Sequence, residues 1–125
     1  MRRDPEVVLW WGTGPECASA LIHLGRQGDL TSLDVMKAQA IVEHLRSRSF
    51  EIQPTEEVRA RTVRILSVHP LRTAAAFQLA AALVWCRERT QGVDFVSLDE
   101  SLRLAAALEG FRVMPYADEV HEPGP

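Results

Sequence analysis

The chain has 125 residues, of which 46% are hydrophobic and 25% charged, as in ordinary globular domains. Its formal net charge of -3 argues against a strongly basic nucleic-acid-binding protein. An acidic total still leaves room for a metal site and a local arginine cluster. Two cysteines are too few for a small secreted disulfide scaffold, so we expect a cytoplasmic protein. No apolar run approaches the roughly 18 residues that a membrane span needs.

The first segment predicts a strand followed by a helix. Residues 7–11 are continuously apolar, which is typical of a parallel strand buried on both faces. Thr13 then has the character of an N-cap, and Glu16 stands three residues later, where it completes a capping box. The helix is expected to end around Gly25 to Gly28, because glycine commonly ends helices.

A second helix is predicted from Thr31 or Ser32 to about Arg48, followed by a short strand at 50–52. The apolar residues at helical spacing are expected to form its inner face. These residues are Leu33, Met36, Ala40, Ile41 and Leu45.

The rest of the chain predicts three helices and two strands. Thr55 caps the first of these helices, whose inner face is expected to comprise Val58, Thr62, Ile65 and Leu66. Residues 73–89 are apolar almost all round, which predicts a central, buried helix. A strand at 93–98, a helix at 100–109 and a final strand at 111–114 complete the pattern. Trp10, Trp11 and Trp85 fall within apolar patterns and are expected in the core.

This alternation predicts an α/β fold, namely an open parallel sheet with helices on both faces. We expect a single domain over residues 6–115 and a flexible acidic tail over 116–125.

Two carboxylates follow predicted strands, where ligands of parallel sheets gather. Glu16 follows the first strand and Asp99 ends the strand at 93–98. Together they are suited to a divalent cation such as Mg²⁺. Each also has a purely structural interpretation, because Glu16 fits a capping box and Asp99 fits an N-cap. The four histidines and two cysteines lack the spacing of a zinc site.

Three segments together resemble a known family in order and spacing, over Val7 to Val113. They read VVLWWGTGPECASALIHLGRQGDL, HPLRTAAAFQLAAAL and FVSLDESLRLAAALEGFRV, and they are similar to the later motifs of PIN domains. The resemblance implies an endoribonuclease that depends on Mg²⁺ or Mn²⁺ and uses several acids to activate water at a phosphodiester. It also implies, for VapC-type toxins, a cognate antitoxin that holds the enzyme inactive.

Carried over by resemblance, Glu16 and Asp99 match two family acids, and Glu100 is an auxiliary candidate. Arg72 precedes the buried helix and is either a phosphate contact or a solvated arginine at a helix start. Ala75 stands where the family has an aspartate, whether by natural decay or by deliberate change. The family's first strand, with its acid, is also missing.

With two acids absent, metal binding and ribonuclease activity are expected to be weak or absent. The alternative is a non-catalytic PIN-like module that binds an antitoxin or another subunit. Because the missing strand is central in the family, we further hypothesise that the chain pairs with a second copy.

Overall fold

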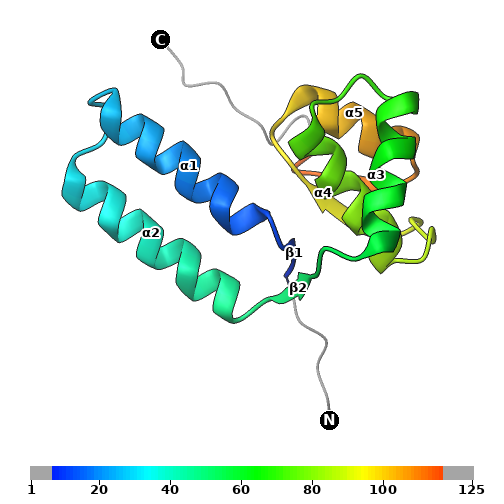
Figure 1. Cartoon of the computed structure of the whole chain (residues 1–125), viewed down its shortest axis with the longest axis horizontal. Helices are drawn as coiled ribbons and strands as arrows, with labels where there is room; N and C mark the ends of the chain where they lie inside the picture. Colours follow the sequence, from blue (N-terminus) through cyan, green and yellow to red (C-terminus); the bar gives the residue numbers. More distant parts are fainter. Residues whose placement is uncertain (1–6, 117–125) are drawn as a thin grey trace. The chain divides into compact units, whose positions relative to one another are not determined.

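The computed structural model describes residues 7–116, in which short strands alternate with helices (Figure 1). The chain divides into two compact units, Met1–Pro54 and Thr55–Pro125. Unit 1 and unit 2 below denote the described residues of each, 7–54 and 55–116. All the strand pairs in these residues are parallel, so the prediction of an α/β protein is confirmed. The described strands form two separate two-stranded sheets, however, and not the single open sheet that was predicted.

The helices and strands fall close to their predicted positions. Unit 1 contains β1 (Val8–Trp10), α1 (Thr13–Arg26), α2 (Ser32–Ser47) and β2 (Phe50–Ile52). Unit 2 contains α3 (Glu56–Val68), α4 (Thr73–Trp85), β3 (Asp94–Val96), α5 (Glu100–Leu108) and β4 (Arg112–Met114). The helix predicted over 73–89 ends early, because Arg87 and Glu88 have positive φ angles of 53° and 64°, which no α-helix accommodates.

Unit 1 is a parallel strand pair with a helical hairpin as its crossover. β1 pairs with β2, with Val8 opposite Phe50 and Trp10 opposite Ile52. Such a connection needs a dozen or more residues, and α1 and α2 supply them. Trp10 is the only buried residue that the structure describes in this unit, so β1 is not buried on both faces as predicted.

The face of α2 that packs on α1 is not the predicted one. Val35 contacts Gly25 of α1, and Val42 lines a groove between the two helices. The predicted inner residues Leu33, Met36 and Ile41 are instead 57%, 66% and 69% exposed. Both sets recur at helical spacing, so the periodicity identifies the helix without deciding which apolar face packs against α1.

The predicted capping box at the start of α1 is wrong. The N-cap is Gly12, which makes no side-chain cap hydrogen bond, and Thr13 is already helical. The Glu16 amide donates to the Gly12 carbonyl at 3.1 Å, so the helix starts one residue earlier than expected. A Cβ at Gly12 would lie 2.6 Å from the Trp10 indole nitrogen, which explains why a glycine occupies this position.

Unit 2 has a continuous hydrophobic core. α3 packs on α4 through Val58, Thr62 and Ile65, as predicted, whereas Leu66 is 38% exposed. Thr55 caps α3, because its hydroxyl accepts from the Val58 amide at 3.2 Å. The prediction that α4 is buried is also confirmed. Its buried residues are Ala76, Leu79, Ala80, Ala81 and Leu83.

The second strand pair closes one side of this core. β3 pairs with β4, with Phe95 opposite Val113. Phe95 and Phe111 are buried, and their ring centroids lie 5.4 Å apart. Of the tryptophans predicted in the core, Trp11 and Trp85 are 50% and 45% exposed, so only the prediction for Trp10 is confirmed.

None of the helices described here is both long and apolar enough to span a membrane. The acidic tail predicted over 116–125 lies outside the described residues, except for Tyr116.

Candidate functional site

Asp99 lies just beyond the carboxyl end of β3 and is the N-cap of α5. Its Oδ1 accepts a hydrogen bond from the Leu102 amide at 3.0 Å, which confirms the N-cap prediction. The Asp99 amide in turn donates to the Ser97 hydroxyl at 3.1 Å. Within the described part of the chain, Oδ2 of this exposed carboxylate makes no hydrogen bond. One oxygen therefore fixes the side chain and the other faces solvent.

Arg103 holds the backbone on both sides of this loop. Its guanidinium donates to the Ser97 carbonyl at 2.8 Å and to the Pro115 carbonyl at 2.7 Å. These carbonyls follow β3 and β4, so one side chain of α5 ties the carboxyl ends of both strands together. Sequence reasoning missed Arg103. No signal in the sequence pointed to it, because both of its acceptors are backbone carbonyls, which every residue carries.

The other predicted site residues of unit 2 are not gathered around Asp99 by direct contacts. Glu100 is exposed in the first turn of α5. Arg72 is exposed at the N-cap of α4 and makes no side-chain cap hydrogen bond. Ala75 is half-buried and packs against the hydrophobic core. Among residues 55–116, no hydrogen bond or ion pair joins Arg72, Glu100 and Asp99.

Glu16 is half-buried in the first turn of α1 and thus belongs to unit 1. Across residues 7–116, no group of three or more His, Cys, Asp and Glu side chains is arranged to hold a metal ion. In unit 2, Asp99 and Glu100 are the two carboxylates at the predicted site. They do not make up the three- or four-acid centre that the resemblance implies.

Asp94, the first residue of β3, is paired with a residue outside the Asp99 loop. It forms an ion pair across the strands with Arg112 of β4. This hydrogen bond lowers the pKa of Asp94 and raises the pKa of Arg112. Asp94 is therefore a charged cross-strand partner and does not serve the Asp99 loop.

A second ionisable pair lies at the C-terminal ends of α3 and α5. His69 Nε2 and Glu109 Oε2 are 2.6 Å apart, and the His69 side chain is only 5% exposed. His69 is therefore a buried helix-end residue with a structural partner. Cys86 is half-buried, and burial raises the pKa of its thiol, which opposes a nucleophilic role.

Asp99 also has a structural role that can be measured. Replacing Asp99 by alanine is expected to lower the free energy of unfolding by about 1 kcal/mol, because the Leu102 amide loses its acceptor. Asparagine caps about as well as aspartate, so Asp99→Asn is expected to retain nearly full stability. Urea unfolding followed by circular dichroism compares the two variants. Equal losses would show that the charge rather than the cap stabilises the loop.

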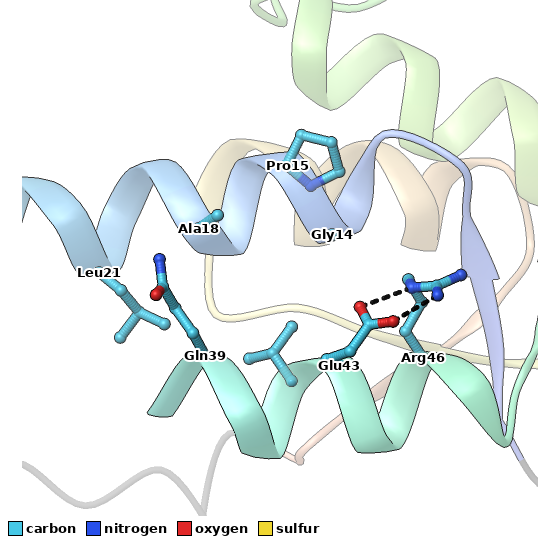
Figure 2. A pocket seen from close by; sticks show the side chains of 8 residues that line it. Gly14, Pro15, Ala18, Leu21, Gln39, Glu43 and Arg46 are labelled. Carbon is cyan, nitrogen blue, oxygen red and sulfur yellow. Dashed lines mark hydrogen bonds and ion pairs between the residues drawn. The ribbon is translucent and has the colours of Figure 1, made fainter. Parts of the chain in front are cut away.

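Unit 1 has a groove between α1 and α2, with a volume of about 390 Å³ (Figure 2). Its apolar wall includes Ala18, Leu21 and Val42. At one end, Glu43 accepts two hydrogen bonds from Arg46, at 2.5 and 2.9 Å, which lower the pKa of the carboxyl group. Arg46 also lies 3.8 Å from the carboxylate of Glu51, so the charged groups at this end of the groove already have partners within unit 1.

No protein-family model, no curated protein and no solved structure matches this chain. Any assignment of function therefore depends on the motifs and on the geometry described above.

Proposed function

We propose that the chain is a PIN-like domain of a VapC-type, metal-dependent endoribonuclease, and that this form cleaves RNA weakly or not at all. The observation that carries the proposal is the position of Asp99. It is an exposed acid directly after a parallel strand, with one carboxylate oxygen left for a ligand. Its motif and those around Glu16 and Arg72 occur in the family's order.

The proposed fold is a PIN-like open parallel sheet that lacks the family's first strand. The parallel pairing of β1 with β2 and of β3 with β4 supports it, because parallel pairs are uncommon outside larger α/β sheets. An isolated pair of strands is marginally stable, so each pair is expected to need further strands or packing against helices.

The proposed loss of activity follows from the number of acids. Mg²⁺ and Mn²⁺ are attracted by negative charge and need a fixed ligand geometry. Ala75 has no negative charge and no oxygen that could bind the metal, and its methyl group packs against the core. The remaining candidates, Glu16, Asp99 and Glu100, would bind the metal more weakly than a complete set of acids.

Restoring the acid tests this proposal. We expect the unaltered chain to cleave a fluorescent single-stranded RNA at or near background with Mg²⁺ or Mn²⁺. Ala75→Asp is expected to raise metal-dependent cleavage at least about tenfold, since one placed carboxylate strengthens metal binding and orients its water. Adding Asp99→Asn, which retains the N-cap, should remove the gain.

Ala74→Asp is the matched control, because it places the same charge one residue away at an exposed position of α4. It should leave cleavage at background. Strong cleavage by the unaltered chain that Glu16→Ala abolishes would refute the proposed inactivity. Failure of Ala75→Asp to restore cleavage in a folded protein, with the upstream strand present if the gene encodes one, would favour the second function.

That second function is a non-catalytic PIN-like module that binds an antitoxin or another subunit. The exposed apolar residues of α2 favour it, because large exposed aliphatic side chains clustered on one helix mark contact surfaces. Pairing with a second copy through the unpaired edges of the strands also belongs to this proposal. Sedimentation equilibrium at micromolar concentration measures it, and a purely monomeric chain would argue against it.

A further inference from the structure

We infer that the outer face of α2 binds a helix of another protein whose contact face carries acidic side chains among aliphatic ones. The outer face of α2 is defined as the side away from the α1 groove, together with the C-cap residue. It comprises Leu33, Met36, Lys37, Ala40, Ile41, His44 and Arg48, all of which are exposed. The inference does not depend on the proposed nuclease activity, but it rests on the second proposed function, because it names the kind of partner that α2 would bind.

The first argument is that unit 1 lacks a core of its own. Neither α1 nor α2 contains a buried residue. Met36 and Ile41 are 66% and 69% exposed, although an isolated helix gains most of its stability from packing an apolar face. The hairpin therefore offers aliphatic surface that a partner can cover.

The second argument concerns charge. Lys37, His44 and Arg48 are seven and four residues apart, so they form one row along the helix. At 100° per residue, this row runs between Leu33 and Ala40 on one side and Ile41 on the other. Within the described residues, neither Lys37 nor Arg48 takes part in an ion pair. Acidic side chains are the complement of this row.

The same row argues against other occupants. A second copy docked by a twofold axis would bring the outer face against itself, and the basic rows would repel each other. RNA would satisfy Lys37 and Arg48 but not the aliphatic side chains, which cannot stack on bases. An anionic membrane is typically bound by clusters of about four to eight lysines and arginines, whereas this face carries Lys37 and Arg48 alone among such residues.

The partner is consequently expected to be an amphipathic helix, recognised by aliphatic anchors that straddle the basic row. The acidic residues on either side of the face already have partners within unit 1. Asp34 is held in a capping box with Thr31, and Glu43 is paired with Arg46. Lys37 and Arg48 are thus the charged groups available to select the partner.

Two synthetic 18-residue helical peptides test the inference on the full chain. They share the same leucine and isoleucine positions and differ only in carrying glutamates or lysines among them. In fluorescence anisotropy, we expect the glutamate peptide to bind at least about tenfold more tightly than the lysine peptide. The double variant Lys37→Glu/Arg48→Glu should reverse this preference. Ile41→Ser should weaken both peptides, because it removes an anchor that they share.

Arg59→Glu is the matched control, since it reverses an exposed charge on α3, outside the outer face of α2, and should leave the preference unchanged. All of these positions are exposed, and circular dichroism verifies the fold of each variant. If the double variant unfolds, Lys37→Glu alone is used and should lessen the preference. Equal or absent binding of the two peptides would overturn the inference. Binding to phosphatidylglycerol vesicles, RNA or a second copy through this face, without preference for the glutamate peptide, would overturn it as well.

Discussion

Replacing Leu79 by alanine is expected to lower the free energy of unfolding by about 3 kcal/mol, within the range measured for buried leucines in other proteins. Leu79 is completely buried and is one of the largest such side chains in the described residues. Ala76 and Ala80, which belong to the same core cluster on α4, are too small to fill the cavity that its loss creates. Urea unfolding of the full chain should show the loss as a midpoint about 1–3 M lower.

Leu108→Ala is the matched control, because it removes the same atoms from a side chain of α5 that is 69% exposed. It should change the free energy of unfolding by no more than about 0.5 kcal/mol. If both substitutions have similar effects, the core assigned around Leu79 is wrong.

The contrast between the two units explains how much of the fold the sequence predicts. In unit 2, α4 is apolar on all sides and α3 has one apolar face, so burial follows directly from composition. The Thr55 and Asp99 caps are local, since each side chain bonds to an amide three residues away. Such features depend on short stretches of sequence and are predicted correctly.

In unit 1, the same reasoning failed at two points for a physical reason. α2 has two apolar faces, one with Val35 and Val42 and the other with Met36 and Ile41. Tertiary packing alone decides between them. The start of α1 depends on the close approach of Gly12 to the Trp10 ring, which a cap pattern does not contain.

The candidate site shows the same division. The sequence identifies Asp99 because it follows a strand and begins a helix. It does not identify Arg103, whose guanidinium bonds to the carbonyls of Ser97 and Pro115, because one of these lies twelve residues away. Carbonyl acceptors are present in every residue and leave no mark on the pattern. Tertiary structure likewise decides which acidic residues come together at a site, and the order of the motifs along the chain does not reveal this.

Gly110→Ala is expected to lower the free energy of unfolding by about 3 kcal/mol, for two reasons that can be separated. First, Gly110 has a φ angle of +98°, which residues with a Cβ rarely adopt. Second, the new methyl group would collide with the Thr90 hydroxyl, which donates to the Glu109 carbonyl at 2.8 Å. Displacing Thr90 breaks that hydrogen bond at the turn into β4. Urea unfolding followed by circular dichroism measures the loss.

Gly92→Ala isolates the first reason, because Gly92 has a φ angle of +79° and an added methyl group would have no neighbouring atom within 4 Å. It should cost only about 1–2 kcal/mol. In a Thr90→Ala background the collision is absent, so adding Gly110→Ala should cost about as much as Gly92→Ala does. The difference between the two backgrounds is the coupling between Gly110 and Thr90. A coupling near zero would mean that the backbone angle alone requires the glycine and that Thr90 yields without cost.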